Sequence, residues 1–232
     1  MEDQRIFEAH DGNLPRNVFL IAEEFRTGFE AVDSIDRPAV TIFGSARVTE
    51  EHPVYKQAED VGRRLAEAGF AVVTGGGPGV MEAANRGAQQ AGGLSVGFAI
   101  DLAHEQKSNP YIDIGLTFKH FYARKTMLVK AAEGFIMFPG GFGTMDELFE
   151  ALTLIQTGKV LNFPVVLFGS EQWEGLLDWI QAQLLAEGYI DEDDEDLLFV
   201  TDDPEEAVRT VIEHYEERTA ETPAEPRKAD AQ

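Results

Sequence analysis

The sequence of 232 residues contains no cysteine, and this absence excludes several kinds of site at once. Without thiols the chain can form no disulfide, no thiolate metal site and no cysteine nucleophile. The five histidines are scattered, with no pair at the spacing that places two metal ligands on one helix face. We therefore expect no metal site.

Basic residues are scarce as well. Lysine and arginine total 19 against 42 aspartates and glutamates, which gives a formal net charge of -23. Such a surface repels nucleic-acid polymers and anionic lipid, so neither is an expected partner. A small phosphate ligand is still compatible with this charge, because it needs only a local pocket of N–H groups and one or two cations.

Long apolar runs are also missing. No stretch approaches the length of a membrane span, and the acidic N-terminus lacks the apolar core of a secretory signal, so we expect a cytoplasmic protein. The chain has only seven lysines, and its acids are spread over the expected helices, which suggests a halophilic protein from a salt-rich cytoplasm. The alternative is an ordinary acidic protein with a charged tail.

What is present is a regular alternation of apolar strands and amphipathic helices. The expected strands lie at 38–44, 70–75, 95–100, 134–139, 164–169 and 197–201. The expected helices lie at 53–68, 78–91, 118–131, 144–157, 173–186 and 204–218, with residues 101–114 as a polar stretch. This order predicts a doubly wound parallel sheet in three α/β/α layers, with the ligand site at the carboxyl ends of the strands.

Three segments make up the chain. Residues 37–217 are expected to form one nucleotide-binding domain, and residues 218–232 a disordered tail. Residues 1–36 form an extension in which 17–34 has the spacing of an amphipathic helix, docked on the domain or on a partner subunit. The acidic run at 190–196 is expected to be a solvated loop, with divalent cation binding as a minor alternative.

A turn between an expected strand and an expected helix carries the sequence Pro-Gly-Gly-Phe-Gly-Thr. Its glycines, Gly140, Gly141 and Gly143, allow a ligand to approach the main chain, and the first helical N–H groups lack internal partners. Thr144 can add a hydroxyl, and Glu147 lies on the same face one turn deeper. The turn predicts a bound anion. The alternative is a capping box between Thr144 and Glu147 that holds nothing.

Two further glycine turns follow strands. The segment Thr74–Met81, with Gly76, Gly77 and Gly79, fits neither the dinucleotide fingerprint nor the Walker loop. A shorter turn, Gly-Ser-Ala-Arg, closes the first strand and presents Ser45. Each alone is as well explained as a tight structural turn. Their convergence on one rim of a parallel sheet is stronger evidence for a ligand.

One basic pair, Arg124 and Lys125, precedes the Pro-Gly-Gly turn on an expected helix. Apolar neighbours such as Phe121 and Leu128 bury most of this helix, and arginine suits bidentate contact with phosphate. The alternative is a surface pair that neutralises nearby acids.

Together these residues resemble the LONELY GUY (LOG) family of cytokinin riboside 5′-monophosphate phosphoribohydrolases, long mislabelled as lysine decarboxylases. The family pattern Pro-Gly-Gly-x-Gly-Thr-x-x-Glu is met in full from Pro139 to Glu147, with the Arg-Lys pair upstream and the Gly-Ser-x-Arg turn. The glycine-rich turn at 75–81 is one residue shorter than the family pattern. The segments 104–111 and 154–159 look like the longer bacterial and archaeal branch.

The resemblance implies a Rossmann-like fold and a homodimer or higher homo-oligomer with sites near the subunit interface. It also implies hydrolysis of the N-glycosidic bond of a nucleoside 5′-monophosphate, AMP or an N6-modified AMP, to free base and ribose 5-phosphate. By matching position, Arg124 and Glu147 become the catalytic pair. No cofactor is expected, because none of the seven lysines stands in a recognisable context for a pyridoxal-phosphate Schiff base.

In this mechanism the carboxylate of Glu147 stabilises the sugar cation or orients the attacking water. Arg124 positions the phosphate or the ribose, with Lys125 as support. Ser45, the glycine-rich turn and Glu82 line the ribose and base side of the substrate. The alternative is a non-catalytic nucleotide-binding protein of the same fold, and the intact Arg124/Glu147 pair counts against it.

Overall fold

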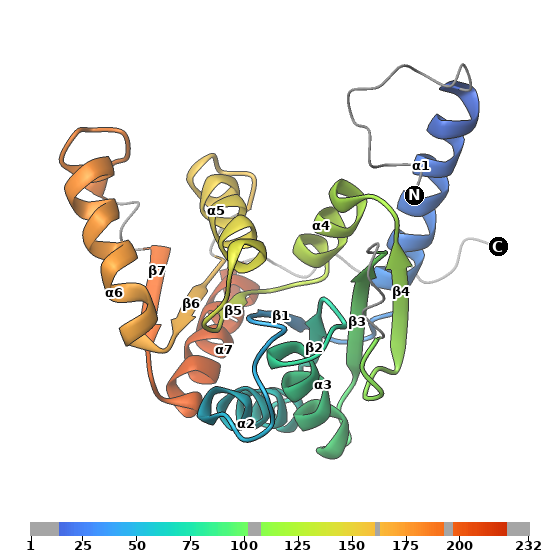
Figure 1. Cartoon of the computed structure of the whole chain (residues 1–232), viewed down its shortest axis with the longest axis horizontal. Helices are drawn as coiled ribbons and strands as arrows, with labels where there is room; N and C mark the ends of the chain where they lie inside the picture. The colour runs from blue at the N-terminus through green and yellow to red at the C-terminus, as the bar shows by residue number, and fades with distance from the viewer. Residues whose placement is uncertain (1–13, 102–107, 161–162, 193–196, 222–232) are drawn as a thin grey trace.

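The fold is that of a computed structural model, which describes residues 14–101, 108–160, 163–192 and 197–221. Within these residues a sheet lies between two layers of helices (Figure 1). The predicted doubly wound α/β architecture is therefore confirmed. The expected tail beyond residue 221 and parts of the 104–111 and 190–196 segments lie outside the described residues. None of the described helices combines the length and the apolar character that crossing a bilayer requires.

Seven described strands form one parallel sheet: β1 (Ala39–Phe43), β2 (Ala71–Thr74), β3 (Ser95–Ile100), β4 (Ile114–Phe118), β5 (Phe135–Met137), β6 (Val165–Phe168) and β7 (Leu198–Thr201). Their order is β4-β3-β2-β1-β5-β6-β7. The central strands are buried on both faces, as their continuous apolar sequences require. The chain order reverses between β1 and β5, and a crevice for a ligand is expected there.

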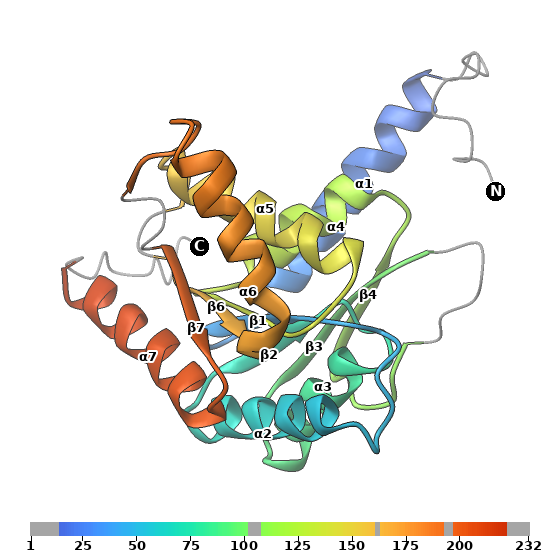
Figure 2. The same ribbon diagram turned by 60° about the vertical axis from the view of Figure 1, so that its left-hand side comes forward.

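The helices divide into two layers (Figures 1 and 2). One layer contains α1 (Leu14–Asp33), α4 (Phe121–Lys130), α5 (Phe142–Gln156) and α6 (Ser170–Trp179), which η1 (Ile180–Leu185) continues as a π-helix. The other contains α2 (Pro53–Glu67), α3 (Val80–Gln90) and α7 (Pro204–Glu221). Neighbouring strand residues face opposite layers: Val40 and Ile42 pack with the second layer, Ala39 and Phe43 with the first.

Three details differ from the sequence-based expectation. Strand β4 was not predicted, because its sequence IGLTF alternates between part-buried and exposed positions at the sheet edge and lacks a continuous apolar run. The single helix expected at 173–186 is α6 followed by η1. Helix α7 extends to Glu221, so residues 218–221 are helical rather than part of the expected tail.

The expected amphipathic helix of the N-terminal extension is α1, and its second half packs on α4. Phe25 stacks on Tyr122, and the main-chain N–H of Lys119 donates to Glu24 Oε1 at 2.6 Å, just before α4 begins. The first half projects away from the sheet (Figures 1 and 2) and leaves Val18 and Phe19 exposed.

Candidate active site

The three glycine turns follow β1, β2 and β5, which are neighbours in the sheet. Main-chain hydrogen bonds join them: Ser45 N donates to Pro139 O at 3.0 Å, and Val80 N donates to Ser45 O at 3.1 Å. The Ser45 turn thus lies between the other two. At Gly79 the backbone has φ +71°, and an added β carbon would overlap Ser45 O, so only glycine allows this close approach.

Helix α5 begins without a side-chain cap. Its N-cap is Gly141 and its first residue is Phe142, so Thr144 already lies inside the first turn. The capping box between Thr144 and Glu147 is therefore wrong, because the extended conformation of Gly141 starts the helix three residues earlier. Gly140 has no room for a side chain, since a β carbon there would overlap the Thr144 hydroxyl. The N–H of Thr144 donates to Gly141 O at 3.0 Å, whereas the N–H groups of Phe142 and Gly143 have no acceptor among the described residues and could bind an anion.

The Glu147 side chain is buried beneath this turn. It is 5% exposed, and its Oε2 has no hydrogen-bond partner among the described residues. Burial raises its pKa from 4.5 to about 7, although the nearby cations of Lys125 and Arg124 act to lower it. A buried acid with an open oxygen and a pKa near neutrality is typical of a functional site.

Arg124 connects α4 to the glycine-rich turn. Its Nε donates to the main-chain oxygen of Phe98 at 2.8 Å, and an added β carbon on Gly75 would overlap its Nη2. Burial lowers the pKa of the guanidinium, and the charge of Glu147 opposes that shift. The predicted pair of Arg124 and Glu147 thus lies close enough in the structure for each charge to affect the other.

Lys125 faces a different set of groups. Its Nζ lies 3.0 Å from Asp146 and 2.5 Å from Glu150, both on α5. Burial lowers its pKa, but these two carboxylates outweigh that effect and the net shift is upward. Lys125 therefore ties α4 to α5 and adds positive charge beside Glu147.

Two other expected ligand-binding positions make internal hydrogen bonds. The N–H of Gly76 donates to Thr74 Oγ1 at 2.9 Å, and Glu82 Oε1 accepts from the Tyr55 hydroxyl at 3.2 Å. Asn109 also bonds to the glycine-rich turn, and the sequence analysis did not single it out. Its amide reaches Gly77 O across 32 positions of the chain, and no local pattern predicts such a contact.

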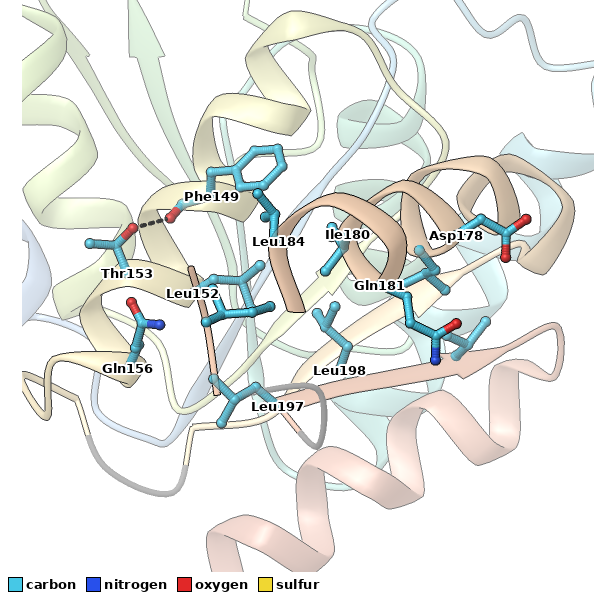
Figure 3. A pocket seen from close by; sticks show the side chains of 13 residues that line it. Phe149, Leu152, Thr153, Gln156, Asp178, Ile180, Gln181, Leu184, Leu197 and Leu198 are labelled. Carbon is cyan, nitrogen blue, oxygen red and sulfur yellow. Dashed lines mark hydrogen bonds between the residues drawn. The ribbon is translucent and has the colours of Figure 1, made fainter. Parts of the chain in front are cut away.

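A pocket of about 340 Å³ lies elsewhere, between α5, α6, η1 and β7 (Figure 3). It is lined mainly by apolar side chains such as Leu152, Leu184 and Leu198, and none of the predicted site residues lines it. Its chemistry does not suit a phosphate. Among the described residues, no three histidine, aspartate or glutamate side chains gather as metal ligands would.

The fold and the three turns define an α/β protein with a candidate anion site at the carboxyl ends of its central strands. The chain belongs to the LOG family, whose model, described as "possible lysine decarboxylase", matches residues 81–211.

Several known proteins are similar to this chain over most of their own length. The cytokinin riboside 5′-monophosphate phosphoribohydrolase of Mycobacterium marinum is 30% identical, over 76% of this chain and 95% of that protein. An uncharacterized protein of Archaeoglobus fulgidus is 33% identical, over 58% of this chain and 87% of its own. An X-ray structure from a structural genomics consortium has a TM-score of 0.59 and 28% identity, covering 76% of this chain and 99% of that one.

Proposed function

We propose that this protein hydrolyses the N-glycosidic bond of a nucleoside 5′-monophosphate, AMP or an N6-modified AMP, and releases free base and ribose 5-phosphate. Water supplies the oxygen that bonds to C1′ of the ribose. The bond between C1′ and the base breaks, and the base leaves with a proton. The name of the mycobacterial relative supports this substrate class.

The observation that carries the proposal is the open, buried carboxylate of Glu147. Breaking the bond to the base develops positive charge on the sugar, and a carboxylate without another partner can stabilise that charge or orient the water. A pKa of about 7 leaves a substantial fraction ionised at neutral pH. A carboxylate already hydrogen-bonded within the protein would be less able to stabilise the sugar cation or to orient the water.

The substrate phosphate is assigned to the first N–H groups of α5, next to Gly140, Gly141, Gly143 and Thr144. Glu147 follows one turn later on the same helix, so the ribose of a nucleotide held there comes within its reach. Arg124, fixed by Phe98 O, supplies a cation to the phosphate or the ribose. Lys125 acts as support through its charge.

A decarboxylase that uses a Schiff-base lysine is a poorer explanation. Such a lysine is activated by a lowered pKa. The pKa of Lys125, the lysine beside Glu147, is raised by its ion pairs with Asp146 and Glu150. Its ammonium is therefore stabilised in the charged form that does not attack a carbonyl.

The test is chromatography of a panel of nucleoside monophosphates, and the matching nucleosides, after incubation with the protein. The wild type should release base from 5′-monophosphates only. Glu147→Gln should still bind nucleotide by calorimetry but turn over at least about a hundredfold more slowly. Glu174→Gln makes the same substitution at an exposed position on α6 and should stay within a few-fold of wild type. Binding without release by the wild type would favour the non-catalytic alternative.

We also infer that the chain forms a homodimer or a higher homo-oligomer. The large exposed apolar side chains lie on α1, α4, α5 and α6 and beside them, and none of those recorded lies on the described parts of α2, α3 or α7. Such a one-sided distribution is typical of an interaction surface. Light scattering should give a multiple of 25.6 kDa, and Phe19→Glu should shift the population toward monomer, whereas a monomeric wild type would refute the assembly.

A further inference from the structure

Two carbonyl groups of the glycine-rich turn after β2 accept hydrogen bonds from one residue, Asn109. The Asn109 main-chain N–H donates to Gly76 O at 2.9 Å, and its side-chain Nδ2 donates to Gly77 O at 3.0 Å. Its Oδ1 accepts from Tyr111 N at 3.1 Å, which fixes the orientation of the amide. Two successive carbonyls of the turn are therefore directed at one residue.

Asn109 is itself anchored in a buried polar network. Its Nδ2 also donates to Asn85 Oδ1 at 2.9 Å, and the same oxygen accepts from the Thr74 hydroxyl at 2.6 Å. Asn85 in turn donates to Ser95 Oγ at 2.8 Å and to Val96 O at 3.2 Å. Thr74, Asn85 and Ser95 are fully buried, so the network has little freedom to shift.

This arrangement sets the direction of one N–H group. In a trans peptide the N–H points opposite to the C=O. Gly76 O accepts from the main-chain N–H of Asn109, so the N–H of Gly77, in the same peptide, points away from Asn109. The Asn109 side chain fixes the next peptide through Gly77 O and, through Asn85, holds residue 109 itself in place. The Gly77 N–H is in a buried residue and has no hydrogen-bond partner among the described residues. Unpaired buried N–H groups are rare, and a ligand is one way to satisfy them. The turn touches Arg124 at Gly75 and the Ser45 turn at Gly79, on either side of Gly77 along the chain.

We propose that Asn109 is a positioning residue, which directs the Gly77 N–H at an acceptor atom of the nucleotide. Asn109 itself does not contact the substrate. The proposal rests on the function proposed above and adds a specific donor to it. Since the bond would form in the bound substrate as well as in the transition state, its loss should raise KM more than it lowers kcat.

The experiment compares Asn109→Ala and Asn109→Asp with Ser95→Ala, using AMP as substrate. Asp keeps the acceptor for Tyr111 N but has no N–H for Gly77 O, so it tests the same contact in a side chain of equal size. Both Asn109 variants should raise KM about tenfold, which is the effect of losing the one hydrogen bond from the Gly77 N–H to the nucleotide. The value of kcat should change by less than about threefold. Ser95→Ala removes a buried hydrogen bond at the far end of the network and should leave KM unchanged.

A direct readout is the Gly77 amide in 15N-labelled Glu147→Gln protein titrated with AMP, where its resonance should shift and the shift should be lost with Asn109→Ala. Equal KM values for the Asn109 and Ser95 variants, or a Gly77 resonance that ignores AMP, would overturn the proposal. If the wild type binds AMP without hydrolysing it, the reaction is wrong, and the dissociation constant replaces KM in the same comparison. Wild-type protein that does not bind AMP would refute both.

Discussion

The two long glycine turns of the site differ in how many of their polar groups are hydrogen-bonded within the protein. After β2, the N–H and C=O of Gly76 and the C=O of Gly77 are all bonded to Thr74 and Asn109. After β5, helix α5 starts with no side-chain cap and covers a carboxylate, Glu147, that has an open oxygen. The first turn is held rigidly and leaves one of its polar groups, the Gly77 N–H, for a ligand. The second keeps groups that a ligand would satisfy, at a cost in stability.

The largest loss of activity is expected from a change at the contact between Gly75 and Arg124. In Gly75→Ala the new methyl group overlaps the end of the Arg124 side chain, which can swing away without unfolding the protein. We expect kcat/KM for AMP to fall by about a hundredfold, because a displaced catalytic group loses its alignment. Gly175→Ala on α6 meets no atom within 4 Å and should keep full activity with slightly higher stability. If Gly75→Ala kept the activity of the wild type, Arg124 would not contribute to the reaction.

Removing the charge of Glu147 should stabilise the protein in a pH-dependent way. Its pKa is about 7 when folded and 4.5 ordinarily, so the folded state prefers the protonated form, and stability is lost as the pH rises from about 4.5 to 7. The stability advantage of Glu147→Gln over wild type should therefore grow, by on the order of 2–3 kcal/mol, as the pH rises from 5 to 8. Urea titrations at both pH values measure this gain. Exposed Glu174→Gln is the control, and an equal, pH-independent response of both variants would contradict the raised pKa.

The opposite result is expected for the turn after β2. Asn85→Ala removes the acceptor of the buried Thr74 hydroxyl and one of the two acceptors of the Asn109 amide, and should cost about 2 kcal/mol of unfolding free energy at any pH between 5 and 8. Urea unfolding of this variant beside Glu147→Gln sharpens the comparison. If both variants changed stability in the same direction, the division into a rigid and a costly turn would be wrong.

The smallest effect on stability is expected from added salt. The net charge of -23 opposes compaction, and cations that screen it should raise the melting temperature by a few degrees across a potassium chloride series. A melting temperature that did not rise with salt would remove the halophilic hypothesis. Comparison with sodium chloride at equal ionic strength would separate screening from ion-specific binding.

Much of the fold follows from the sequence because buried parallel strands have continuous apolar sequences, as in AVTIF of β1 and VVLF of β6. Edge strand β4 was missed because it is only partly covered. Within the site, Glu147 and Arg124 were predicted by a motif with fixed spacing. The role of Asn109 was not, because its partners at Gly76, Gly77 and Asn85 are distant in sequence and only the folded sheet brings them together.

The most direct test of the account is a crystal structure of Glu147→Gln with AMP, which the variant should bind without cleaving. We expect the 5′-phosphate on the first N–H groups of α5 and C1′ of the ribose beside the side chain at position 147. A nucleotide bound in the apolar pocket between α5 and β7, or with its ribose turned away from position 147, would contradict the proposed reaction.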